Sequence, residues 1–421
     1  MKRIGEIPSQ KFSVEGFFLQ IGSEIKEHDK TPGGTVPCEQ LRIISAPLYI
    51  SIESTKNEGE ADLYDYGFSV LEQYELTVKS TARTRGGLLC QTDRSPAVLR
   101  EQRGSGKKLQ KQQELLLKLE ENGCLVDTFL ENKEGELIST DRDGISYTLQ
   151  RWYEGRECDT RSREQILQAV GMLAGIHKEM KLPTDLSYME ENLNDEYQRH
   201  NQELRKIRRF IRKKGPACAF EKEYLKSVEW FLARGELAVN MLRASSYADL
   251  REKAKEEGTV CHGEYNQHNV LILKSKTAVT GFSHWCFGIQ IGDLYHFMRK
   301  ILEKSGWNIN LAEEMLKTYH RIRPISAEEW ENLKIRFTYP EKFWKLSNYY
   351  YTHNKAWISE KNTEKLQALI RQKEKEKLRR QVLDDCAPEF RSFFYSTAGF
   401  GMIRMRLDYP CVRIFFTCWI S

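Results

Sequence analysis

Two residues of one short segment have the types and spacing that chemistry on a phosphate requires. Glu264 follows His262-Gly263, and Asn269 comes five positions after the glutamate. A carboxylate can orient and deprotonate an attacking hydroxyl, and an amide oxygen can bind Mg²⁺ beside a nucleotide. We therefore take Glu264 and His262 as candidate catalytic residues and Asn269 as a candidate metal ligand. The simpler alternative for His262 and Asn269 is a structural role, in which they hydrogen-bond the loop itself.

The surrounding elements predict that this segment is a loop between strands. The apolar run Val270–Leu273 follows it and, after a polar turn, so does Ala278–Thr280, which is typical of a second short strand. Asp293 then precedes a run with helical spacing. Because Asp is a favoured N-cap residue, we expect Asp293 to cap this helix rather than to bind a metal ion.

Residues 64–152 predict a small β-rich unit around one helix. Leucines at helical spacing predict a helix over Ser105–Asn122, with Ser105 as its N-cap and Gly123 after its end. Asp143-Gly144 predicts the turn of a hairpin. Short apolar or alternating runs indicate strands at Tyr74–Ser80, Gly87–Gln91, Ala97–Leu99, Leu125–Leu130, Glu136–Ser139 and Ile145–Trp152.

Residues 153–258 and 311–383 have the periodicity of helices. One helix, Asn201–Lys214, has an apolar side, which includes Phe210, and a densely basic side. The basic side carries Arg205, Lys206, Arg208, Arg209, Arg212, Lys213 and Lys214. A solvated charged face is the usual explanation, and the alternative is a site for an anionic polymer or an acidic partner. Base stacking would need aromatic residues on the basic side, which argues against nucleic acid.

The composition of the 421-residue chain is that of an ordinary globular protein, with 40% hydrophobic and 30% charged residues. A net charge of +5 is too small for a dedicated nucleic-acid binder. No apolar run has the length of a membrane-spanning helix. The ten cysteines are scattered, which favours a reducing compartment, and His268, His284 and His296 do not have the spacing of a zinc site.

The two ends of the chain differ from the rest. Residues 1–60 combine turn-forming and polar segments, and predict a loosely ordered N-terminal extension. Residues 386–421 contain no lysine and are rich in phenylalanine. They form an aromatic tail whose order the sequence leaves open, since such a segment is either docked on the body or foreign to the fold.

Several longer motifs occur in order along the chain. They are Tyr66–Tyr74, Leu99–Ser105, Glu134–Thr140, Trp152–Cys158, Asp293–Lys300, Phe343–Asn348 and Asn354–Ile358. With the loop His262–Asn269, they resemble the CotS family of spore coat proteins, which has the fold of aminoglycoside and choline phosphotransferases. The resemblance covers roughly residues 64–380 and includes neither end of the chain.

This resemblance implies a bilobal, protein-kinase-like α+β fold. The small antiparallel β-sheet lobe would be residues 64–152, the hinge would lie near Arg151–Gly155, and the larger helical lobe would be residues 153–380. The resemblance also implies a protein of a spore-forming bacterium, made in the cytoplasm of the mother cell and then deposited in the spore coat. Its partners would be other spore coat proteins.

Two departures from an active kinase of this fold bear on the implied chemistry. Active members have Asp where this chain has Glu264, and the added methylene moves the carboxylate by about 1 Å, which can cost around a hundredfold in rate. The Asp expected just before Phe282, the main ligand of a bridging Mg²⁺, is replaced by Gly281. Glycine has no side-chain oxygen.

The resemblance also assigns residues of the small lobe to nucleotide binding. Arg100 lies where a kinase has its phosphate-pairing lysine, and Glu114 on the following helix is its expected ion-pair partner. Gly86 and Gly87 lie where a glycine-rich loop would cover the phosphates, and serve equally well as a hairpin turn. Trp152 lies at the hinge.

These features predict a structural or assembly protein of the spore coat with a degenerate kinase-like fold, and we expect it to need no cofactor. The alternative is a weakly active kinase of small molecules or sugars, which would require ATP and Mg²⁺. A second alternative is an anion-binding scaffold that acts through the basic helix 201–214.

Overall fold

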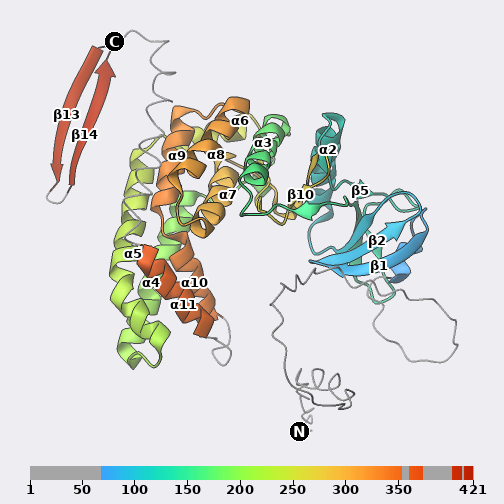
Figure 1. Cartoon of the computed structure of the whole chain (residues 1–421), viewed down its shortest axis with the longest axis horizontal. Helices are drawn as coiled ribbons and strands as arrows, with labels where there is room; N and C mark the ends of the chain where they lie inside the picture. The colour runs from blue at the N-terminus through green and yellow to red at the C-terminus, as the bar shows by residue number, and fades with distance from the viewer. Residues whose placement is uncertain (1–67, 353–359, 373–400, 410–411, 421) are drawn as a thin grey trace, which may run out of the picture. The chain divides into compact units, whose positions relative to one another are not determined.

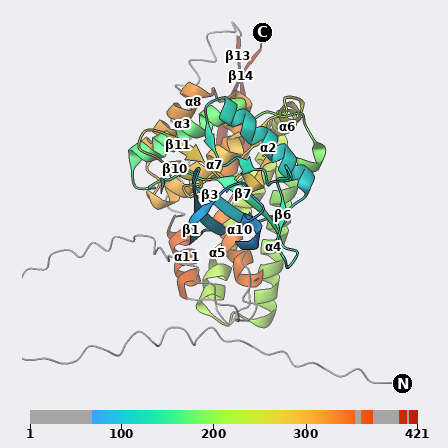
Figure 2. The same cartoon turned by 90° about the vertical axis from the view of Figure 1, so that its right-hand side faces the viewer.

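An antiparallel sheet forms the N-terminal part of the structure (Figure 1). This computed structural model describes residues 68–352, 360–372, 401–409 and 412–420. After a short helix, α1 (Phe68–Leu71), the strand order is β1-β2-β3-β7-β5, and β6 also pairs with β7. The strands are β1 (Val78–Thr84), β2 (Gly87–Thr92), β3 (Ala97–Glu101), β5 (Phe129–Leu130), β6 (Ser139–Thr140) and β7 (Ser146–Arg151). Every pair is antiparallel, as predicted, and Figure 2 shows β3 beside β7.

The predicted helix after β3 is confirmed as α2 (Gly106–Glu121), with Ser105 at its N-cap position. Four of its five leucines lie on one face because residues three and four apart stack along a helix, and Leu117 is exposed. This face is buried in the main hydrophobic core, which also contains residues of the helical lobe. The leucines are Leu109, Leu115, Leu116 and Leu119.

A second sheet joins segments from both sides of the hinge. Its order is β4 (Leu125–Val126), β11 (Thr277–Val279), β10 (Val270–Ile272) and β8 (Arg156–Glu157). β4 is parallel to β11, whereas β5 belongs to the first sheet. The prediction of one strand over Leu125–Leu130 is therefore wrong, because the chain turns between the two sheets at Asp127-Thr128. A smaller pair, β9 (Val260–Cys261) and β12 (Cys286–Phe287), flanks the candidate loop.

Helices form the rest of the described body. They are α3 (Arg163–Glu179), α4 (Leu193–Lys214), α5 (Ala219–Ala244), α6 (Tyr247–Glu256), α7 (Ile291–Lys304), α8 (Ile309–Ile322), α9 (Ala327–Thr338), α10 (Glu341–Thr352) and α11 (Glu360–Arg371), with short 3-10 turns η2 (Leu186–Tyr188) and η3 (Phe282–His284). The helices α4, α5, α10 and α11 lie side by side around a second apolar cluster (Figure 1). This cluster includes Phe220, Phe231 and Phe343.

Two further strands, β13 (Gly401–Tyr409) and β14 (Val412–Ile420), pair antiparallel within the predicted aromatic tail. The predicted extension at residues 1–60 and the motif Asn354–Ile358 lie outside the described residues. In the described part of the chain, every helix is too short or too polar to span a membrane.

Candidate functional site

A buried aspartate holds the backbone of the candidate loop. Oδ2 of Asp293 accepts a hydrogen bond from His262 N at 2.7 Å, and Oδ1 accepts one from Gly263 N at 3.0 Å. Nε2 of His177 lies 3.2 Å from the same Oδ2. Burial opposes ionisation of Asp293, but these hydrogen bonds and the neighbouring histidines outweigh it and lower its pKa below the usual value. The carboxylate is therefore ionised and fixes the start of the loop.

The prediction that Asp293 caps a helix is wrong. The helix α7 begins at Ile291, with Gln290 at the N-cap position, so Asp293 lies inside the first turn. Ile291 is fully buried, which extends the helix beyond the apolar run that marked it in the sequence. The carboxylate serves the N–H groups of a loop 31 residues earlier in the chain, rather than those of its own helix.

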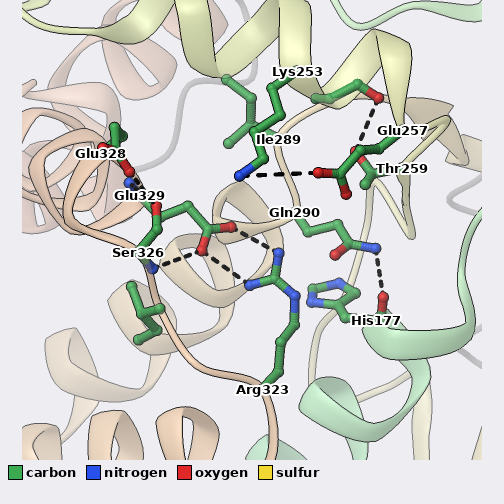
Figure 3. A network of polar contacts seen from close by, with 12 residues as sticks. His177, Lys253, Glu257, Thr259, Ile289, Gln290, Arg323, Ser326, Glu328 and Glu329 are labelled. Atoms are coloured by element: carbon green, nitrogen blue, oxygen red, sulfur yellow. Dashed lines mark hydrogen bonds and ion pairs between the residues drawn. The ribbon is translucent and has the colours of Figure 1, made fainter. Parts of the chain in front are cut away.

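A polar network supports His177 (Figure 3). The Tyr319 hydroxyl lies 2.7 Å from Nδ1 of His177, and burial lowers the pKa of the imidazole. A neutral ring that accepts at Nδ1 from Tyr319 and donates from Nε2–H to the aspartate satisfies both contacts. Nε2 of Gln290 donates to His177 O at 2.9 Å, and Arg323 binds both carboxylate oxygens of Glu329 at 2.7 and 3.2 Å. Tyr319, Gln290 and Asp293 therefore hold His177 behind the loop, and the Arg323–Glu329 ion pair lies in the same region.

His262 is fully buried, and both of its ring nitrogens are bonded inside the loop region. Nε2 lies 3.1 Å from Thr280 O, and Nδ1 accepts a hydrogen bond from Glu264 N at 3.2 Å. Burial lowers the pKa of the imidazole, which favours the neutral ring. This geometry supports the structural role of His262, because neither nitrogen is left for a substrate.

Glu264 and Asn269 line a hollow of about 510 Å³. The half-exposed carboxylate of Glu264 has Oε2 at 3.5 Å from Nε2 of His284. The other walls come from the turn between β1 and β2, the loop and the helices α7 and α10. The residues are Arg85, Asn266, Gln267, His268, Lys300, Glu303, Lys304 and Lys342. The structure therefore brings together the predicted base position and the predicted metal ligand.

The charge of this hollow is positive. Its four cations, Arg85, Lys300, Lys304 and Lys342, outnumber its two acidic residues, Glu264 and Glu303. Glu303 is already paired, since its carboxylate lies 2.8 Å from Nζ of Lys342. A concave surface with excess positive charge attracts anions.

Asn269 fills the space beside Gly281. Its Nδ2 donates to Glu264 O at 2.9 Å, so the amide holds the loop. Gly281 has φ = +81°, in the left-handed region that favours glycine. A Cβ at this position would lie 2.9 Å from both Cγ and Oδ1 of Asn269. A side chain at position 281 would therefore collide with Asn269.

Asp127, which was not predicted as a site residue from the sequence, also contacts Gly281. Its Oδ2 accepts a hydrogen bond from Gly281 N at 2.8 Å, whereas its buried Oδ1 has no hydrogen-bond partner. Burial raises the pKa of Asp127 to about 6, and the charge of Arg100 opposes this shift. The available signal was one acidic residue within the mostly apolar run Cys124–Leu130.

The predicted ion pair between Arg100 and Glu114 is wrong. Glu114 is exposed on α2, and the ion pairs of the described residues do not join it to Arg100. The reason is that α2 directs Leu115 and Leu116 inward and Glu114 outward. The Arg100 guanidinium carbon instead lies 5.7 Å from the ring centroid of Trp152, the predicted hinge residue, and its charge acts on buried Asp127.

Gly86 and Gly87 form the end of a tight hairpin. Thr84 pairs with Gly87, which leaves Arg85-Gly86 as a two-residue turn with φ = +72° at Gly86. A Cβ at Gly87 would lie 2.5 Å from Leu99 O on the next strand. The turn therefore explains Gly86, and the close approach of β3 explains Gly87. Arg85 is the residue of this turn that reaches the hollow.

Much of the basic side of α4 pairs with α5. Arg208 and Arg212 bind Glu229 at 2.6 and 2.8 Å, and Lys214 binds Glu221 at 2.7 Å. Arg205 forms an ion pair with Glu236. These contacts favour the structural explanation of the basic residues over an anion-binding surface.

The fold and the loop together define a protein of the kinase-like phosphotransferase fold. The chain belongs to the family described as spore coat putative kinase YutH, whose model matches residues 69–382. It is therefore a spore coat protein with a kinase-like fold, and the resemblance to the CotS family is confirmed.

Other comparisons agree. The chain is 23% identical to spore coat protein S of Bacillus subtilis (strain 168) over 287 residues, which cover 66% of this chain and 81% of that protein. The solved aminoglycoside phosphotransferase of Alicyclobacillus acidocaldarius has a TM-score of 0.67 at 15% identity, and the match covers 79% of this chain and 98% of that one. Spectinomycin phosphotransferase APH(9)-Ia, solved with ADP and spectinomycin, has a TM-score of 0.51 at 12% identity and coverages of 73% and 93%. At these identities the solved structures show the fold alone.

Proposed function

We propose that this chain serves the spore coat as a structural or assembly protein and that its kinase-like fold does not transfer phosphate. The observation that carries this proposal is the arrangement at Gly281. Phosphoryl transfer in kinases depends on metal ions that bridge the phosphates and neutralise the developing charge. Gly281 supplies no oxygen from a side chain, and the side chain of Asn269 occupies the adjoining space.

The remaining donors fit a bridging Mg²⁺ poorly. Mg²⁺ requires near-octahedral oxygen ligands, usually one or two carboxylates together with substrate phosphates. Asp127 contacts Gly281, but one of its oxygens accepts a hydrogen bond from Gly281 N. Burial raises the pKa of Asp127 to about 6 and so opposes the ionised form that a metal ion would bind. The carboxylate of Glu264 lies beside His284. These contacts support a cleft that does not assemble the metal site of an active kinase.

The partners in this proposal are other coat proteins, and the relative named spore coat protein S is in keeping with that assignment. The chain would be made in the mother-cell cytoplasm and then incorporated into the coat.

A titration of the full chain with ATP, with and without Mg²⁺, tests the proposal. We expect the melting temperature to show no Mg²⁺-dependent rise with ATP, and calorimetry to detect no Mg²⁺-dependent binding. Mg²⁺ alone and ATP with EDTA are the controls. A clear rise with Mg-ATP that disappears in Asn269→Ala would overturn the proposal, because it would show that Asn269 still holds a metal ion.

The second candidate function is a weakly active small-molecule or sugar kinase. The observation in its favour is that Glu264 and Asn269 line one hollow together with Arg85 and Lys300. Such an enzyme would use Glu264 as the base and bind ATP with Mg²⁺. Mass spectrometry of candidate acceptors after incubation with ATP tests it. Phosphorylated product that is absent with Glu264→Gln would support it, and strict absence of product with the unaltered chain would exclude it for those acceptors.

A further inference from the structure

Two cysteines face each other across the strands that flank the candidate loop. β9 and β12 pair antiparallel, with Cys261 directly opposite Cys286. Cys261 immediately precedes His262, and Cys286 follows the turn that begins after Gly281. The side chain of Cys286 is near enough to raise the pKa of the Cys261 thiol, and both thiols are free. The two cysteines therefore lie where the strand before the loop pairs with the strand that follows Gly281.

The strand register brings these cysteines to the spacing of a disulfide. Residues directly opposite in an antiparallel pair have Cα atoms about 4.5–5.5 Å apart. A disulfide requires about 4.4–6.8 Å, so bond formation needs no large movement of the backbone. Among the strand pairs of the described residues, no other cysteine lies opposite a cysteine.

We propose that Cys261 and Cys286 form a disulfide when the protein meets a two-electron oxidant such as hydrogen peroxide. Cys286 is partly exposed, whereas Cys261 is only 4% exposed, so the oxidant reaches Cys286 first. The Cys286 sulfur attacks the peroxide, the O–O bond breaks, and a sulfenic acid and one water result. The Cys261 sulfur then attacks this sulfenic acid, and the oxygen leaves as a second water. Two thiols and one peroxide thus give one disulfide and two waters.

The second step has a predicted pH dependence. The hydrogen bond with Cys286, together with burial, raises the pKa of the Cys261 thiol well above its usual value. The attacking species is the thiolate, so cross-linking becomes faster as pH rises. Asp293 and Glu190 oppose the ionisation of Cys261. Arg323 and Tyr319 also interact with Cys261, and the positive charge of Arg323 favours the thiolate.

This cross-link goes beyond the proposed coat function and does not depend on whether phosphate is transferred. A protein that leaves a reducing cytoplasm loses the thiol systems that keep cysteines reduced. The bond would close a covalent ring from residue 261 to residue 286, which contains the whole candidate loop and Gly281. The disulfide would then hold the loop in its folded arrangement in an oxidising environment and without a bound ligand.

Peptide mapping of the full chain tests the proposal. The protein is treated with hydrogen peroxide, alkylated, and digested with trypsin without reduction. We expect peptides 256–274 and 277–299, each with one cysteine, to appear as a linked pair that is 2 Da lighter than their sum and separates with dithiothreitol. The melting temperature of the oxidised protein should rise by roughly 5 °C.

Matched variants make the test specific. Cys286→Ser should abolish the linked pair, whereas Cys124→Ser, which removes another partly exposed cysteine, should leave it unchanged. Circular dichroism establishes that each variant is folded before oxidation. The proposal is overturned if the folded, unaltered chain gives both peptides separately alkylated, or if Cys286 is recovered mainly as sulfinic acid or linked to a different cysteine.

Discussion

Replacing Gly281 by Asp shows whether the cleft merely lacks one ligand. The structure predicts that Gly281→Asp costs stability without restoring a metal site. A side chain at φ = +81° costs about 1–2 kcal/mol. The new Cβ would also displace Asn269 from Glu264 O, and the loss of that hydrogen bond costs about 1 kcal/mol. The free energy of unfolding should therefore fall by about 2–3 kcal/mol, and ATP should still give no Mg²⁺-dependent stabilisation.

Gly281→Ala is the matched control, because it adds the Cβ without the carboxylate and should lose a similar amount. Asn269→Ala removes the colliding atoms. The double variant Gly281→Asp with Asn269→Ala should therefore be less destabilised than the sum of these two single variants. Guanidinium unfolding followed by circular dichroism measures the four variants and the unaltered chain. If Gly281→Asp unfolds at the wild-type midpoint and gains Mg²⁺-dependent ATP binding, the steric reasoning is refuted.

Three further outcomes follow from the described contacts. Because the pKa of Asp127 rises from 3.8 to about 6, the fold should lose about 3 kcal/mol as pH rises between these values, and Asp127→Asn should flatten that loss in unfolding curves at pH 4 to 8. Asp293 has a lowered pKa, so its contribution to the free energy of unfolding is present above pH 3.8 and is lost as pH falls below that value. At pH 7, Asp293→Ala should lower the free energy of unfolding by about 3–5 kcal/mol in guanidinium. A loss below 1 kcal/mol would contradict the anchoring role of Asp293. Ser326→Ala, which removes the capping box of α9, should cost about 1 kcal/mol by the same assay and leave the thermal response to ATP unchanged.

The features that could be predicted from the sequence are those whose structure depends on residues close together in the chain. The leucines of α2, the Asp143-Gly144 turn and the loop around Glu264 each have a signature within a few residues. The wrong or missing assignments involve partners far apart in sequence. Asp127 reaches Gly281 across 154 positions, which happens only because β4 pairs with β11. Asp293 resembles a cap in isolation, and its actual role depends on a loop that local periodicity cannot place beside it.

The position of β4 has a consequence for how the two lobes can be separated. A boundary drawn at the hinge, after Trp152, assigns β4 and α2 to the small lobe. The structure pairs β4 with β11 and packs α2 in the same core as the helices. Expression of residues 153–380 alone would therefore remove an outer strand, leave the backbone of β11 unpaired on that side, and expose the apolar surface that α2 covers. The described body, residues 68–352, is better regarded as one interlocked folding unit than as two modules joined by a flexible connection.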